Sequence, residues 1–272
     1  MRLRGVSFLI LAASLGTWGA LHAQKPFVEY PTVEGHAESA IPPDYQNPSE
    51  WTRARLRYRD YYGQAGFGFR RSAGSWTIDY PRSDRHLLQG VRRLTRIDTR
   101  SVEQVVDLDK SDDIYNWPFV YAVEVGHWDL NEEEAKEMRE FLNRGGFLMV
   151  DDFHGTAEWE VFVEGMKKVF PDREIVDLPK DEPIFHTVSD LDDKYQVPGA
   201  QYLNSGRTYE QDGYNAEWRG IKDDKGRVVV AICHNMDLGD AWEWSDEPAY
   251  PEKWASLAYR IAVNYIVYDL TH

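Results

Sequence analysis

A short apolar segment between a glycine pair and a run of polar residues constrains the fold of this chain most. Residues 145–155 read GGFLMVDDFHG, so that four apolar residues lead directly into Asp151 and Asp152. An apolar run of this length, bounded by turn residues, is typical of a buried strand in a parallel sheet. Ligands of open α/β sheets bind outside the carboxyl ends of such strands. The segment therefore predicts a parallel sheet and indicates the edge at which to search for a site.

Helical and strand-like segments alternate along the rest of the chain. The clearest helix follows Asn131, a favourable N-cap, with three glutamates at the positive end of the helix dipole and Gly145 as a left-handed closing residue. The other expected strands cover residues 53–58, 66–70, 105–108, 119–125 and 227–233, and the other expected helices start at Ser83, Thr156 and Pro251. Because parallel neighbours need crossover connections, this alternation predicts an α/β fold, a three-layer sandwich around a doubly wound, mostly parallel sheet.

Three regions of the chain differ in composition. Residues 1–23 have the layout of a Sec-type signal peptide, with Arg2 and Arg4 before an apolar core that is too short for a permanent transmembrane helix. This pattern predicts an exported, periplasmic or extracellular protein with no membrane span once the signal is removed; an uncleaved N-terminal anchor is the alternative. Residues 24–50 contain five prolines among polar residues and are predicted to be a linker or surface arm. Residues 51–272 are predicted to form a single α/β domain.

Charge and cysteine content narrow the classes of partner. The formal net charge is −15, and such an acidic surface repels nucleic acid and anionic lipid, so neither is an expected partner. Cys233 is the one cysteine, which excludes an intramolecular disulfide. An exported chain of this length must therefore be stabilised by its hydrophobic core.

Polar side chains gather where the predicted strands end. His127, His154 and His234 each stand at or just beyond the carboxyl end of a predicted strand. If these strands are neighbours, the three imidazoles converge with further polar side chains, namely Asp151, Asp152, Asn235 and Asp237. Imidazole and carboxylate together bind divalent metals or perform acid and base chemistry. The alternative is structural, because a histidine at a strand end often bonds a loop carbonyl and an aspartate there often caps the next helix.

No cofactor is predicted from these residues, and a divalent metal is the candidate that stays open. Tight ligand spacings such as H-x-H or H-E-x-x-H do not occur in the chain. Trp242 follows the last predicted strand in a loop between acidic residues. An exposed tryptophan there would suit stacking on a sugar ring, whereas the structural alternative is a lid packed on the pocket floor.

Several blocks in this order resemble a bacterial family known as domain of unknown function 4159. The resemblance covers roughly residues 51–272, and the blocks are Val125-Gly126-His127, the helix and glycine pair at 130–146, Asp151-Asp152, Val169-Phe170-Pro171, Glu182-Pro183-Ile184-Phe185, and Asp237-Leu238-Gly239 with Trp242. The family is similar to the class I glutamine amidotransferase-like superfamily, which implies a flavodoxin-like three-layer fold. It implies no established activity.

The chain departs from the working amidotransferases at the nucleophile. Those enzymes place a cysteine in a tight strand-to-helix elbow of the form G-x-C-x-G, which exposes the thiol beside backbone donors. No such segment occurs here, and Cys233 lies inside an apolar run, where a small buried side chain is expected. The sequence therefore argues against glutaminase activity.

Three functional hypotheses remain. The first is a noncatalytic, exported domain that binds a small polar ligand, with carbohydrate as one candidate, at the carboxyl ends of the strands. The second is a hydrolase acting on cell-envelope or polymer material, with Asp151 or Asp152 as general base or metal ligand and His127 or His234 assisting. The third is a subunit of an envelope assembly, tethered to a protein partner by the proline-rich arm.

Overall fold

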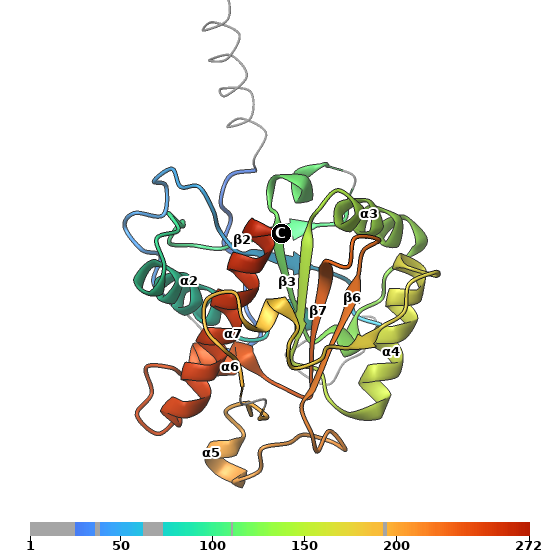
Figure 1. Cartoon of the computed structure of the whole chain (residues 1–272). Coiled ribbons are helices and arrows are strands. Elements are labelled where there is room, and N and C mark those ends of the chain that lie inside the picture. The colour runs from blue at the N-terminus through green and yellow to red at the C-terminus, as the bar shows by residue number, and fades with distance from the viewer. Residues whose placement is uncertain (1–24, 36–38, 62–72, 110, 193–194) are drawn as a thin grey trace, which may run out of the picture.

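The computed structural model describes residues 25–35, 39–61, 73–109, 111–192 and 195–272 (Figure 1). The predicted signal at 1–23 and the predicted strand at 66–70 lie outside these residues. Among the described residues, seven strands form one sheet in the order β2-β1-β3-β4-β7-β6-β5. Their bounds are β1 Ala54–Arg57, β2 Gln104–Asp107, β3 Phe119–Val123, β4 Phe147–Asp151, β5 Val176–Asp177, β6 Glu217–Lys222 and β7 Val228–His234.

The strand directions confirm the predicted α/β fold. The pairs β2–β1, β1–β3, β3–β4 and β4–β7 are parallel, whereas β6 is antiparallel to both of its neighbours. The parallel part has the strand order of flavodoxin-like proteins, in which the chain first extends the sheet to one side of β1 and then to the other. The topological switch point therefore lies between β1 and β3.

Helices cover both faces of the sheet, which gives the three layers (Figure 1). One face packs against α2 (Arg82–Leu94), α6 (Leu238–Glu243) and α7 (Glu252–Thr271), and the other packs against α3 (Glu132–Asn143) and α4 (Gly155–Val169). A short α5 (Tyr202–Ser205) and the 3-10 turns η3 (Ser75–Thr77), η4 (Asp113–Asn116), η5 (Val125–His127) and η6 (Pro183–Phe185) complete the connections. Side chains alternate between the faces: Tyr121 packs with the first group of helices, and Val120 and Ala122 pack with the second.

Helix boundaries follow local capping chemistry where the sequence supplies it. Asn131 caps α3 by accepting from the backbone amides of Glu133 and Glu134, and Glu134 closes a capping box, as the sequence predicted in part. Gly145 has a φ of 101°, the left-handed conformation expected after this helix. The predicted cap Ser83 is wrong, because α2 starts one residue earlier, after Pro81. The predicted cap Thr156 is also wrong, because His154 occupies that position before α4.

A buried ion-pair group fastens β1 to α2. The guanidinium Nε atoms of Arg53 and Arg55 lie 2.8 Å from Asp84 Oδ1 and 2.9 Å from Asp84 Oδ2, respectively, and all three side chains are fully buried. Arg55 also donates to the carbonyl oxygens of Trp76 and Ile78, each at 3.0 Å. These bonds fix the segment that precedes α2, and that segment contributes to the candidate site.

The proline-rich arm contacts the α/β domain. Lys25 donates its backbone amide to Asp113, and Tyr30 donates its backbone amide to the Tyr80 hydroxyl. None of the helices in the described part of the chain combines the length and apolarity needed to span a bilayer.

We expect the Asp84→Ala variant to lose about 3–5 kcal/mol of unfolding free energy, because two buried guanidinium groups lose their carboxylate partner. Urea denaturation of the purified chain measures this change. Asp107→Ala is the matched control: its ion pair with Arg57 is partly exposed, so the loss is about 1 kcal/mol or less. Equal losses in both variants would contradict the proposed role of the buried group.

Candidate functional site

The carboxyl ends of β3, β4 and β7 meet at one edge of the sheet. Val123, the last residue of β3, pairs with Asp151, the last residue of β4, and β7 lies next to β4 and ends at His234. We call the residues that follow these three strands, together with the segments that pack on them, the carboxyl edge. This edge also borders the switch point between β1 and β3, since the Tyr58 hydroxyl after β1 donates to the carbonyl oxygens of Val123 and Glu124.

Two histidines of the carboxyl edge lie in triads with carboxylates. In the first triad, His127 Nδ1 lies 2.9 Å from Glu124 Oε2, and His127 Nε2 lies 4.0 Å from Glu158 Oε1. In the second, His154 Nε2 lies 3.2 Å from Asp152 Oδ1 and 3.8 Å from Glu210 Oε1. Within each triad, one potential ligand atom from each residue lies within 4.8 Å of the others. Each triad therefore offers one nitrogen and two oxygen donors to a metal ion.

Glu158 connects the two triads. Its Oε2 accepts the backbone amide of His154 at 2.5 Å, while its Oε1 faces His127 of the other triad. Gly126 makes this approach feasible, because a Cβ at that position would lie 2.3 Å from Glu158 Cβ. The turn after β3 and the first turn of α4 therefore pack without space for a larger residue.

A second half of the carboxyl edge contains carboxylates only. Asp79 belongs to one triad with Asp237 and Asp240 and to another with Glu34 and Glu243. Asp237 is also the N-cap of α6, where its Oδ1 accepts the backbone amide of Asp240 at 2.7 Å. The predicted site residue Asp237 thus has a structural role and lies beside potential metal ligands.

Burial and mutual repulsion raise the pKa values of three acids of the carboxyl edge. Desolvation raises the pKa of Asp152 well above its usual range, and the charges of Glu124 and Glu210 add to the effect. Desolvation acts in the same way on Asp79 and Asp237, with Asp240 and Asp152 as the leading repulsive neighbours, respectively. These acids therefore favour the binding of protons or of a cation, since either reduces their negative charge.

Asp151 lies beneath this edge. Its side chain is fully buried, and its Oδ2 accepts from the Tyr121 hydroxyl and from the backbone amides of Leu238 and Gly239 at 2.9–3.0 Å. Burial raises its pKa to about 7 despite these bonds. Asp151 therefore connects the first turn of α6 to β4. This is a structural role, the alternative that the sequence left open for an acid at a strand end.

His234 and Asn235 hold the loop before α4. His234 Nε2 lies 3.1 Å from the carbonyl oxygen of Gly155, and burial lowers the pKa of this imidazole to about 4. Asn235 accepts the backbone amide of Gly155 at 2.9 Å and donates to the carbonyl oxygen of Asn215 at 2.8 Å. These contacts give both side chains a structural role beside His154, and neither side chain belongs to a histidine triad.

The loop and the exposed stacking surface expected at Trp242 are wrong, whereas its burial agrees with the structural alternative of a packed side chain. Trp242 lies in helix α6 rather than in a loop, and its side chain is fully buried against Tyr121, with 5.6 Å between ring centroids. It is therefore a core residue and no exposed stacking surface. Cys233 is buried, as predicted.

Sequence reasoning missed several members of the carboxyl edge. Glu124 directly follows β3, and Glu158 lies one helical turn after His154, so both positions carry a local signal. Glu210 comes from an irregular loop without any pattern. The same loop carries Tyr214, which is 62% exposed and whose ring centroid lies 4.8 Å from that of Tyr209. Tyr214 is thus an exposed aromatic side chain close in sequence to a potential metal ligand.

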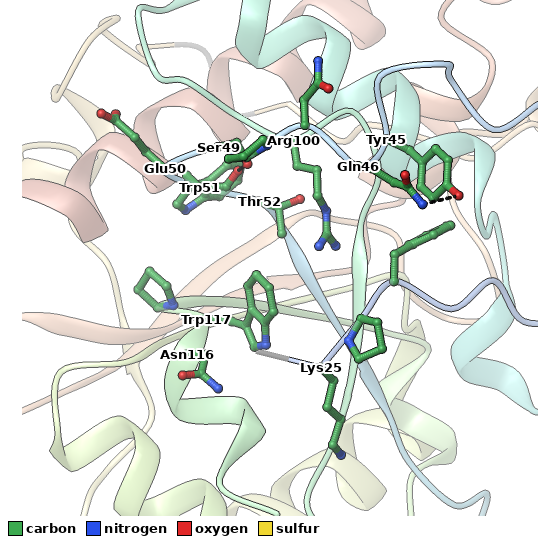
Figure 2. A pocket seen from close by; sticks show the side chains of 15 residues that line it. Lys25, Tyr45, Gln46, Ser49, Glu50, Trp51, Thr52, Arg100, Asn116 and Trp117 are labelled. Carbon is green, nitrogen blue, oxygen red and sulfur yellow. Dashed lines mark hydrogen bonds between the residues drawn. The ribbon is translucent and has the colours of Figure 1, made fainter. Parts of the chain in front are cut away.

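A cavity of about 370 Å³ lies at the opposite edge of the sheet, between the arm and the starts of the strands (Figure 2). The guanidinium of Arg100 points toward the ring of Trp117 there, at 5.4 Å from its centroid (Figure 2). Arg100 also donates to the carbonyl oxygen of Val102 at 2.9 Å and stacks near Phe27 of the arm. Phe27 is therefore one point at which the arm packs on the domain.

The comparison with protein families identifies the domain. A family model described as "Domain of unknown function (DUF4159)" matches residues 54–270. The chain belongs to this family. The resemblance to this family expected from the sequence is thereby confirmed, and the match includes every strand of the sheet. Among curated proteins, no sequence matches the chain.

We expect the unfolding free energy of the metal-free protein to fall as the pH rises from about 4 to about 8. Burial raises the pKa of several carboxyl groups to about 7 or 8: Glu103, Asp151, Asp269 and Glu243. Because such groups titrate near about 4 in an unfolded chain, the native state binds more protons across this window. His234 has a lowered pKa of about 4, so its contribution to the unfolding free energy rises between pH about 4 and pH about 6.5. The four carboxyl groups together outweigh this single group.

Urea denaturation in the presence of a chelator, at pH 5 and at pH 8, measures this effect. The midpoint is expected at higher urea at pH 5. A midpoint that is equal at both values, or higher at pH 8, would contradict the proposed excess of buried, uncompensated acid.

Proposed function

We propose that this protein is an exported, noncatalytic binding domain of class I glutamine amidotransferase-like fold, which holds a divalent metal ion and, through it, a small polar ligand at its carboxyl edge. The observation that carries the proposal is the Asp152, His154 and Glu210 triad, in which an imidazole nitrogen and two carboxylate oxygens converge within 4.8 Å. Export rests on the signal-like pattern of residues 1–23.

The donor set favours a metal of the Zn²⁺ or Mn²⁺ type. Imidazole suits transition metals and zinc, while carboxylate oxygens also accept harder ions such as Mn²⁺. Burial and neighbouring acids raise the pKa of both Asp152 and Glu210, so a bound cation relieves repulsion that protons otherwise relieve. Glu158 supports His154 by accepting its backbone amide, which fixes the start of α4.

A three-ligand metal site leaves coordination positions for a ligand. Metals bound by three protein side chains bind water or substrate at the remaining positions. Neighbouring hydroxyl groups of a carbohydrate have the oxygen donors for this, and sugars also present an apolar face to aromatic rings. Tyr214, with its exposed ring close in sequence to Glu210, is suited to that contact. A metal-bridged carbohydrate is therefore the ligand class that we favour.

The position of Cys233 argues against an amidotransferase-type reaction. The thiol is fully buried, and burial raises its pKa well above the usual range, so the reactive thiolate is disfavoured. With no other cysteine in the chain, the nucleophile of that chemistry is missing.

A metal-assisted hydrolase acting on envelope or polymer material is the second candidate. It is favoured by His127, which lies between Glu124 and Glu158 next to the metal triad. Burial opposes a charge on this imidazole, yet the bond to Glu124 raises its pKa above the usual value, which suits a proton donor. Release of reducing sugar ends from cell-wall polymer by the metal-loaded protein, lost in His127→Ala, would favour this candidate over the first.

We expect Zn²⁺ or Mn²⁺ to raise the melting temperature by roughly 5–10 °C when present at about 100-fold above its Kd. Glu210→Gln removes one donor while keeping its shape, and we expect it to weaken metal affinity by about tenfold or more. His154→Ala should do the same. His186→Ala is the matched control, because this exposed histidine pairs with Asp190 and belongs to neither triad.

Thermal unfolding and calorimetric titration measure these effects. Unchanged metal affinity in both Glu210→Gln and His154→Ala would refute the site. For the ligand, Tyr214→Ala should weaken binding of monosaccharides to the metal-loaded protein without changing metal affinity.

A further inference from the structure

The all-carboxylate half of the carboxyl edge shares no residue with the histidine triads. It contains five acids from three parts of the chain: Glu34 of the arm, Asp79 before α2, and Asp237, Asp240 and Glu243 in and around α6. The nearby cation Arg82 pairs with Asp246 at 2.7 Å, and its charge also acts on Glu243. An acidic cluster alone does not establish a site, so a second observation is needed.

That observation is a buried oxygen without a partner. Asp79 is 1% exposed, and its Oδ2 has no hydrogen-bond partner among the described residues. A buried carboxylate oxygen without a partner costs stability, and such atoms are rare in native proteins. The Oδ2 faces the first turn of α6, since a Cβ on Gly239 would lie 2.1 Å from it. Gly239 stands between Asp237 and Asp240, the two acids that share a triad with Asp79.

The arm contacts the backbone of Asp79 and of the residues just before it. Glu34 Oε2 accepts the backbone amide of Asp79 at 2.7 Å. Two residues earlier, the Thr32 hydroxyl donates to the carbonyl oxygen of Thr77 at 3.1 Å, and the backbone amide of Val33 donates to the Thr77 hydroxyl at 3.3 Å. Residues 32–34 therefore run along the segment that ends at Asp79, which brings an arm carboxylate to the cluster.

We propose that this cluster binds Ca²⁺ through Asp79, Asp237 and Asp240, and that Glu34 and Glu243 complete the shell, so that the ion clamps the arm onto the domain. All donors are oxygens, and Ca²⁺ takes six to eight oxygen ligands in flexible geometry. Mg²⁺ demands a near-ideal octahedron and retains its waters, so it fits a crowded set of carboxylates less well. This site is additional to the metal site of the proposed function and does not depend on it.

Calcium binding to the purified chain with its arm tests the proposal. We expect equilibrium dialysis at pH 7.5 to show bound calcium, and limited proteolysis within the arm to slow by roughly tenfold on adding CaCl₂, because cleavage of the arm requires its release. Asp79→Asn keeps the size of the side chain but removes its charge, and it should abolish both effects. Glu34→Gln should lose most of the arm protection while calcium still binds the domain with reduced affinity.

Matched variants separate this site from the histidine triad. Glu210→Gln should retain calcium binding and arm protection, whatever it does to Zn²⁺ or Mn²⁺, because it removes no ligand of this cluster. Asp224→Asn, at a side chain that is 91% exposed, is the control for a lost surface charge. Circular dichroism confirms that each variant is folded.

Two results would overturn the proposal. One is the absence of bound calcium at pH 7.5 while acid alone stabilises the protein, which would assign the neutralisation of the cluster to protons. The other is calcium binding and arm protection that persist unchanged in Asp79→Asn, which would place the ion elsewhere.

Discussion

The carboxyl edge depends on one buried acceptor, Asp151 Oδ2. This oxygen accepts hydrogen bonds from the Tyr121 hydroxyl of β3 and from two backbone amides in the first turn of α6. Since Asp151 ends β4, these bonds connect β3, β4 and α6 at a single point. The position of α6 then determines where Asp237 and Asp240 lie. A residue that the sequence marked as a site candidate thus organises the site from beneath, because its contacts orient the groups that face outward.

The carboxyl edge gathers many negatively charged side chains at the end of the parallel strands, and their mutual repulsion destabilises the fold. The fold balances charge well where stability alone is concerned, as in the buried group of Arg53, Arg55 and Asp84. At the carboxyl edge, in contrast, acids from the arm, the turn before α2 and the start of α6 lie near one another. Burial raises the pKa values of two of them, Asp79 and Asp237. Groups held in this way are typical of functional sites, where a ligand supplies the missing charge.

Much of the fold could be predicted from local pattern, whereas half of the site could not. The apolar runs and the Asn131 cap indicated the strands and the clearest helix, because both signals lie within a few residues. Asp151 follows Phe147 and Met149 in strand alternation and so points to the face that α6 covers, a consequence visible only once α6 is placed. Helix α6 itself has six residues, too few to show a helical period, so the sequence alone indicates a loop at Trp242.

The two halves of the carboxyl edge are close enough to affect each other. Asp152 of the histidine triad is among the charges that raise the pKa of Asp237, and Asp240 is among those that raise the pKa of Asp152. A cation bound to either half lowers the repulsion felt by the other half's acids in their charged form. The first ion therefore changes the affinity of the other half for a second ion, and by linkage the second ion changes the affinity for the first by the same factor. The direct repulsion between the two cations opposes this effect, and solvent screens it only weakly among buried groups. The distance between the two sites therefore decides whether the net coupling is favourable.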